Sequence, residues 1–387
     1  MSIRKDLKEA GNLVFLRKDE EALEIYEKYF KENFEDFTKR DRTSYAWAIY
    51  RVHIKDPKDQ FELFDYAEFI TEITGQADLN RRSTCPYTLA VFRVMDKLNN
   101  QNDFFNLVYW IEKINPDLLS PKRPSSNGRR IRSRKEKYFD YASRTYFALQ
   151  DYEECIEVSK KALKSIFRFT NYGDTWHRWR MAKSLGQLGQ HEEALKYLNE
   201  VIRQKQEWYI YKEIADNHFA LGNTDEALRN ISEAILAKGD DDKKVNLYGL
   251  AYCILNESEP EIALRHAELY SLIKLESGSS TILEEIEDLD IDGNTLDMFD
   301  LKAQIRDYWK RFKFRDQQLQ YGTVTRFFED KNYGFIKTND DESIFFHRKE
   351  FNGDAIYIGQ LVSFYTEMRF DKSKSRESVN AVNIRGE

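Results

Sequence analysis

An internal repeat in the middle of the chain is the feature that most constrains its fold. The segments ALQDYEECIEVSKKAL (148–163), QLGQHEEALKYLNEVI (187–202) and ALGNTDEALRNISEAI (220–235) share one pattern. Each contains the end of one helix, a short polar turn, and an amphipathic helix that opens with acidic residues. A single unit of this kind cannot bury its apolar face alone, so successive units are expected to stack. The pattern predicts an array of helical hairpins.

Small residues recur at equivalent places in these hairpins. Cys155, Ala194, Ala227 and Ala263 follow one another at intervals of 33 to 39 residues. A second small residue precedes several of them by twelve positions, which lets two antiparallel helices approach closely. These pairs are Ala182/Ala194, Ala215/Ala227 and Ala251/Ala263, and the same spacing of twelve joins Ala10 to Ala22 near the start of the sequence.

At these residues the chain resembles the tetratricopeptide repeat (TPR) family. The resemblance is clear over 136–270, fair over 3–36 and weak over 43–118, where Phe104 replaces the small crossing residue. We therefore expect an all-α TPR-like solenoid over 1–283, degenerate over 37–120, with a basic loop over 120–137. The resemblance implies a groove that recognises a protein or peptide. From the residues alone, contact with an RNA backbone or a role as spacer or dimer interface stays open.

The last 68 residues have a different pattern. Short runs of β-branched and aromatic residues alternate with polar turns: YGTVTRFF, YGFIKT, SIFFHR, GQLVSFYTEMRF and SVNAVNI. Five short strands in so few residues predict a small all-β barrel over 320–387.

Two of these strands carry aromatic residues, and the second of them carries aromatic residues on both faces. Tyr333 and Phe335 lie two apart and share a face, as do Phe345 and His347, whereas Phe346 points the other way. A small barrel needs only one apolar face of each strand for its core, so one aromatic set is expected outside. Exposed rings on adjacent strands can stack on unpaired bases, at about 1–3 kcal/mol per base.

The motifs at 331–336 and 344–347 resemble the cold-shock domain family, an OB-fold barrel that binds single-stranded RNA or DNA. The resemblance implies base stacking by Phe327, Tyr333, Phe335, Phe345 and His347, and a phosphate-facing role for Lys331. The family's usual Trp is Arg326 here, the aromatic after the histidine is Arg348, and Asn332 replaces a Gly. Arginine can both stack on a base and pair with phosphate, so these departures favour more electrostatic, salt-sensitive binding. The other interpretation of this face is a degraded or protein-binding surface.

Charge is unevenly distributed along the chain. With 60 Lys+Arg against 67 Asp+Glu the net charge is −7, which excludes attachment to nucleic acid by bulk positive charge. An acidic linker is expected over 284–300 and a basic helix over 301–319. Basic residues that could support the barrel fall in three places: Lys372, Lys374 and Arg376 in a barrel loop, Arg129, Arg130, Arg132 and Arg134 near the basic loop, and Lys310 and Arg311 on the basic helix.

Signals of enzymatic function are sparse. The sequence has no GxxxxGK[ST], HExxH or GxSxG motif, and no metal or cofactor is expected. No apolar run approaches the roughly 20 residues of a membrane helix, so a cytoplasmic location without membrane contact is expected. The sequence predicts a non-enzymatic adaptor that binds single-stranded RNA or DNA on the barrel and a protein or peptide on the groove, RNA being favoured by the family and by its cytosolic abundance. The alternatives are a pure protein scaffold, or a regulatory subunit of a nuclease, helicase or defence complex, whose barrel no longer binds nucleic acid.

Overall fold

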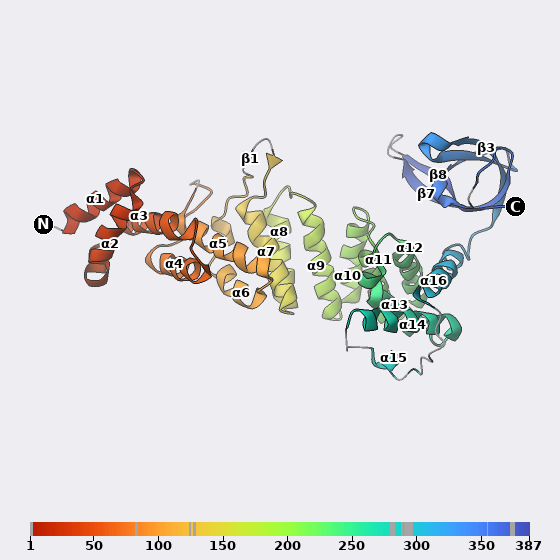
Figure 1. Cartoon of the computed structure of the whole chain (residues 1–387), viewed down its shortest axis with the longest axis horizontal. Helices are drawn as coiled ribbons and strands as arrows, with labels where there is room; N and C mark the ends of the chain where they lie inside the picture. The colour runs from red at the N-terminus through yellow and green to blue at the C-terminus, as the bar shows by residue number, and fades with distance from the viewer. Residues whose placement is uncertain are drawn as a thin grey trace. The chain divides into compact units, whose positions relative to one another are not determined.

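The chain folds as two compact units, 1–205 and 206–387, and Figure 1 labels their helices and several of their strands. The structure is a computed structural model that describes residues 3–81, 84–123, 125–126, 129–278, 283–287, 289, 297–353, 355–371 and 376–387. Within these ranges, no helix has both the length and the apolar character that crossing a membrane would require.

The first unit consists of α-helices that pack against their neighbours in the chain. They are α1 (Ile3–Phe15), α2 (Asp19–Asn33), α3 (Lys39–Ile49), α4 (Gln60–Ile73), α5 (Pro86–Gln101), α6 (Phe104–Glu112), α7 (Arg134–Ala148), α8 (Tyr152–Ser165), α9 (Gly173–Gln187) and α10 (His191–Ile202). Between them lie the 3₁₀ turns η1 (Phe34–Asp36) and η3 (Pro116–Leu118), the π-helical turn η2 (Tyr50–Ile54), and a hairpin of β1 (Ser125–Ser126) and β2 (Arg129–Arg130).

Several of these helices begin at a residue whose side chain caps the helix. The Ser133 hydroxyl accepts a hydrogen bond from the backbone N–H of Glu136 at the start of α7, and Asp151 accepts one at the start of α8. Thr38 and Asp41 form a reciprocal capping box at the start of α3. Such a cap satisfies a backbone N–H that has no partner inside the helix, and its loss typically costs about 1 kcal/mol.

The small residues lie between paired helices, as the repeat predicts. Ala10, Ala22, Ala182 and Ala194 are completely buried in the pairs α1–α2 and α9–α10. In the pair α7–α8, Cys155 lies against Ser143, twelve residues earlier, and its thiol donates to the Ser143 carbonyl oxygen at 3.3 Å. The predicted helical hairpins are therefore confirmed here.

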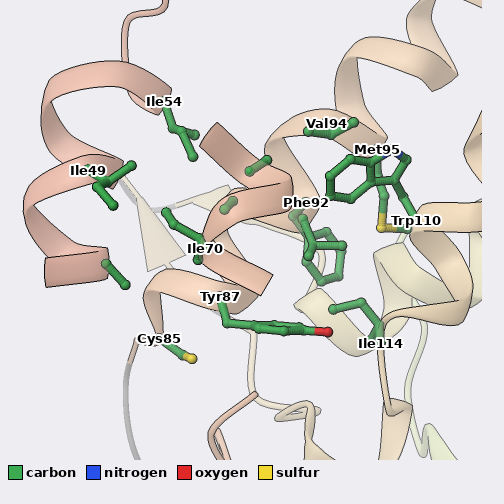
Figure 2. Packing of buried hydrophobic residues seen from close by; sticks show 14 of the residues in the cluster. Ile49, Ile54, Ile70, Cys85, Tyr87, Phe92, Val94, Met95, Trp110 and Ile114 are labelled. Atoms are coloured by element: carbon green, nitrogen blue, oxygen red, sulfur yellow. The ribbon is translucent and has the colours of Figure 1, made fainter. Parts of the chain in front are cut away.

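The weakly repetitive segment also folds as packed helices. Figure 2 shows buried side chains of this region, among them Ile49, Ile70, Phe92 and Met95, packed together in one apolar cluster. Phe104, which replaces the small crossing residue, is half-buried against the same cluster, directly after the capping residue of α6. Apolar packing therefore continues through α3–α6 although the small-residue pattern does not.

The second unit begins with helices of the same kind. They are α11 (Trp208–Ala220), α12 (Thr224–Leu236), α13 (Val245–Leu255), α14 (Pro260–Glu276), the short α15 (Glu284–Glu287) and α16 (Met298–Lys313), with the 3₁₀ turn η4 (Asp241–Lys244) before α13. The small residues of α11–α12 and α13–α14 are completely buried: Ala215, Ala227, Ala251 and Ala263.

The chain ends in a small closed β-barrel, which confirms the expected fold class. Its strands are β3 (Gln320–Phe328), β4 (Tyr333–Thr338), β5 (Ser343–His347), β7 (Leu361–Asp371) and β8 (Arg376–Gly386), with the two-residue β6 (Phe351–Asn352) beside β8. The sheet order is β5-β4-β3-β7-β8-β6, and pairing of β5 with β8 closes the barrel. Its core contains Val324, Ile336, Ile344, Phe346, Phe351, Val362, Phe364, Ala381 and Ile384.

Candidate nucleic-acid interface

Strands β4 and β5 separate their aromatic residues onto two faces. Tyr333 pairs with His347 across the ladder and Phe335 pairs with Phe345, while Gly334 pairs with the buried Phe346 between them. Because successive side chains of a strand alternate, the two outer pairs share the face away from the core. Their rings are in contact: the Tyr333 and Phe345 centroids are 5.4 Å apart, and those of Phe335 and Phe345 are 5.9 Å apart.

Gly334 keeps the strands close beneath these rings. A Cβ at this position would lie 2.5 Å from the Arg326 carbonyl oxygen and 2.6 Å from the Phe346 ring. Only a residue without a side chain fits there without displacing β3 or the core ring. The glycine between the two outer aromatics therefore fixes the spacing of the sheet under the candidate site.

A bulge in β3 changes which phenylalanine joins the outer face. The pairing of β3 with β4 shifts between Val324 and Arg326, so two consecutive residues there are exposed. After the bulge, Phe327 turns toward the barrel and stacks on Phe346, with centroids 6.1 Å apart and planes 6° apart. Phe328 instead pairs with Tyr333 at 5.0 Å.

We call the outer rings Phe328, Tyr333, Phe335 and Phe345, together with His347, the aromatic platform. Phe327, expected among the stacking residues, is half-buried against the core. The family resemblance implies Phe327 rather than Phe328 at this place, and the register shift in β3 is what brings Phe328 to the outer face. The Phe327–Phe328 doublet is the sequence signal from which a bulge could have been considered.

Cationic side chains flank the platform. Arg326 is exposed and lies opposite Phe335 across the ladder, and the Lys331 ammonium lies 6.0 Å from the centroid of Phe328. Lys337 is also exposed but forms an ion pair with Asp341 at 2.7 Å. A hollow of about 320 Å³ opens beside Phe335; its lining is Thr325, Arg326, Phe335, Lys337, Asp341 and Ser343.

The turns at the ends of β4 and β5 orient the remaining predicted residues. Asn332 has a φ of 55°, a left-handed conformation that Asn adopts more readily than most residues, so it can replace the glycine usual in the family. His347 Nδ1 accepts the Lys349 N–H at 3.3 Å, which leaves Nε2 to carry the proton of the neutral ring. The Arg348 guanidinium donates to the carbonyl oxygens of Phe351 at 3.3 Å and Gly353 at 2.9 Å, so it supports the following turn.

The contacts of the described residues do not bring the other predicted basic residues to the platform. Lys372 and Lys374 lie outside the described residues, and Arg376, which opens β8, is described by its backbone alone. Arg129 and Arg130 form β2, and their side chains are likewise not described. Arg132 pairs with Asp140 of α7 at 2.9 Å, and Arg134 is the first residue of α7.

Helix α16, which was expected as a separate basic helix, packs on α12 and α14. Its residues Leu301, Ile305, Trp309 and Phe312 are buried in the core of the second unit. Much of its positive charge is paired with acids, since Lys302 lies 3.4 Å from Asp241 and Arg311 lies 3.3 Å from Asp307. Lys310 is half-buried on the same helix. These contacts give α16 a structural role in addition to any contact with nucleic acid.

The end of α16 connects the helices to the barrel. Lys313 Nζ lies 2.9 Å from Glu233 of α12 and 2.6 Å from Glu367 of β7. Burial alone would lower the pKa of Lys313, but the two carboxylates raise it overall. The next residue, Phe314, stacks on Tyr365 of β7, with centroids 4.6 Å apart. An ion pair and a ring stack therefore join α16 to the strand beside β8.

Family models match part of the helical array and the barrel. The model described as "'Cold-shock' DNA-binding domain" matches residues 320–384, and the tetratricopeptide repeat model matches 138–166 and 178–207. The chain carries TPR repeats and a cold-shock domain. Both are non-catalytic kinds of domain; the cold-shock domain indicates nucleic-acid binding and the TPR repeats indicate protein interaction. No curated protein matches the chain significantly.

Solved structures of other helical proteins resemble the chain only distantly. The apo form of RapI is 14% identical, with 81% of this chain and 88% of that chain covered, at a TM-score of 0.41. A tetratricopeptide repeat protein from Parabacteroides merdae is 15% identical, with 78% and 98% covered, at 0.35. A human IFIT1 dimer with PPP-AAAA is 14% identical, with 82% and 66% covered, at 0.37. Every one of these scores is below 0.5, so no functional conclusion follows from them.

Proposed function

We propose that this protein is a non-enzymatic adaptor that binds single-stranded nucleic acid, RNA in preference to DNA, on the aromatic platform of its cold-shock domain. The TPR repeats serve as its protein-interaction module. The observation that carries the proposal is the contact of several outward aromatic rings on adjacent strands above a separate, filled barrel core. Unpaired bases present flat faces that stack on such rings whatever their sequence.

The charges around the platform support stacking as the main source of affinity. Arg326 and Lys331 are exposed beside the rings, whereas Lys337 pairs with Asp341 and the fork of Arg348 donates to backbone carbonyls. Two phosphate contacts to a single strand give a slope of log K against log salt of about −1.4. Because Arg348 is engaged within the fold, we expect binding by the barrel to weaken less steeply with salt than the arginine substitutions alone predict.

The proposal is tested by fluorescence anisotropy of labelled RNA and DNA oligonucleotides of matched sequence. Full-length protein is compared with the double variant Phe335→Ala/Phe345→Ala, which removes two touching rings from the platform. Loss of stacking at two bases predicts an affinity at least about tenfold weaker, since each stacked base contributes about 1–3 kcal/mol. The matched control is Tyr357→Ala, because Tyr357 is also in the barrel and is 65% exposed but lies outside the platform.

The outcomes separate the proposal from its alternatives. Unchanged RNA and DNA binding by the double variant would refute the platform as the binding surface. Absence of any binding by the full-length protein would favour a protein scaffold or a regulatory subunit. A tighter complex with DNA than with RNA would refute the stated preference while leaving the platform in place.

A further inference from the structure

One edge of the first unit combines two basic segments that are far apart in sequence. Residues 118–135 contain seven basic residues and no acidic one, and residues 158–173 contain four basic residues and no acidic one. The Arg123 guanidinium donates to the carbonyl oxygen of Arg168, and Thr170 donates to Glu136 at the start of α7. These contacts place the chain beside the β1–β2 hairpin next to the loop between α8 and α9 (Figure 1). A chain of net charge −7 thus concentrates positive charge at this edge.

The loop between α8 and α9 also exposes aromatic rings beside cations. Phe167 is 94% exposed, and the Arg168 guanidinium lies 5.7 Å from the centroid of its ring. Tyr172 is 59% exposed, and the Lys205 ammonium lies 5.2 Å from its centroid. A ring as exposed as Phe167 contributes little to the core, so its position is not explained by packing.

Some cations of this edge are neutralised and others are not. Arg123 lies 3.8 Å from Glu136, and Arg132 pairs with Asp140. By contrast, four exposed basic residues form no ion pair with any residue that the structure describes: Lys122, Lys161, Lys164 and Arg168. We call these four residues, together with Phe167 and Tyr172, the α8 edge patch.

We propose that the α8 edge patch is a second contact surface for single-stranded nucleic acid. Such a strand alternates phosphates, which pair with the unneutralised cations, and bases, which stack on Phe167 and Tyr172. The carboxylates of an acidic peptide would pair with the same cations but have no flat face to stack on Phe167, whereas every nucleotide carries both a charge and a stacking face. The inference does not depend on the barrel, because the α8 edge patch belongs to the first unit and the aromatic platform to the second.

The test measures binding of labelled oligouridylate and oligothymidylate of about 30 nucleotides, longer than one OB-fold occupies. It uses the full-length protein, both with an intact platform and with Phe335→Ala/Phe345→Ala. In each background, Lys122→Glu/Arg168→Glu reverses two charges of the α8 edge patch and Phe167→Ala removes a ring. The matched controls are Lys5→Glu/Lys8→Glu, which reverses two exposed charges of α1, and Phe105→Ala, which removes a 78% exposed ring of α6.

We expect the charge reversal to weaken binding about tenfold and to make the salt slope shallower by about 1.4, the value for two phosphate contacts. Phe167→Ala is expected to weaken binding about fivefold or more. The inference is overturned if these variants bind like the controls in both backgrounds. It is also overturned if the charge reversal abolishes binding of a labelled oligoglutamate but leaves oligonucleotide binding unchanged. If the platform variant has no effect while the edge variants do, the inference stands and the proposed function of the barrel fails.

Discussion

A buried histidine on α14, bonded to a tryptophan of α16, predicts that the packing of α16 depends on pH. His266 on α14 is completely buried; its Nδ1 lies 2.7 Å from the Ile262 carbonyl oxygen, and its Nε2 accepts the Trp309 indole N–H at 2.9 Å. The neutral ring with its proton on Nδ1 satisfies both hydrogen bonds. A proton on Nε2 would face the indole N–H. Burial lowers the pKa of His266 to about 4, against a smaller opposing effect of the hydrogen bond to Ile262.

The pKa gives the size and the sign of the effect. A fall from the ordinary value of 6.5 to about 4 corresponds to about 3 kcal/mol, at about 1.4 kcal/mol for each tenfold change in the equilibrium. Between these two pH values the unfolded state binds more protons than the folded state, so stability falls as the pH is lowered. The stability of the folded state is therefore highest above pH 6.5 and falls progressively down to about pH 4. Below the folded-state pKa, His266 causes no further change in stability.

Hydrogen exchange of the α14 and α16 peptides, corrected for the intrinsic exchange rate, measures this effect in the full-length protein. We expect the opening free energy of α16 to decrease by about 2–3 kcal/mol between pH 7 and about pH 4.5. His266→Gln is the matched control, because its amide can donate to Ile262 and accept from Trp309 without titrating. An equal loss of protection in the wild type and in His266→Gln would refute the assignment to this histidine.

Three further predictions concern single contacts. Gly334→Ala brings a Cβ against the Phe346 ring and is expected to destabilise the barrel by about 1–3 kcal/mol. Hydrogen-exchange protection of β3–β5 measures this loss, and unchanged protection would contradict the tight fit. Lys313→Met and Glu367→Gln should show a coupling energy of about 0.5–3 kcal/mol in a double-mutant cycle of urea unfolding, whereas additive effects would mean that the ion pair contributes nothing. Ser133→Ala removes the cap of α7 and should lower its exchange protection by about 1 kcal/mol, with no change expected in α9.

The parts of the structure that depend on local periodicity could be predicted. The twelve-residue spacing of small side chains identifies helix pairs, because the spacing alone brings two side chains without bulk to one crossing. Because side chains alternate along β4 and β5, the sequence also predicts that Tyr333 and Phe335 lie on one face of the sheet and Phe346 on the other. The helices between residues 39 and 112 were harder to identify, since large side chains such as Phe104 fill the contacts there and leave no repeated signature.

Contacts between distant segments required the tertiary structure. The β3 bulge exchanges the roles of Phe327 and Phe328, because a single extra residue reverses the face of every residue after it. In the same way, Arg348, Lys302 and Arg311 look available in a charge count but have partners in the fold.

The sequence by itself determined that the chain has helical hairpins and a small barrel with outward aromatic residues, since these follow from spacing within one element or between neighbours, and its motifs resemble those of TPR repeats and cold-shock domains. Only the tertiary structure decided which rings touch, which charges are neutralised, and that Phe167 stands exposed beside a basic edge. The physical reason is that both burial and charge pairing depend on residues brought together from distant parts of the chain.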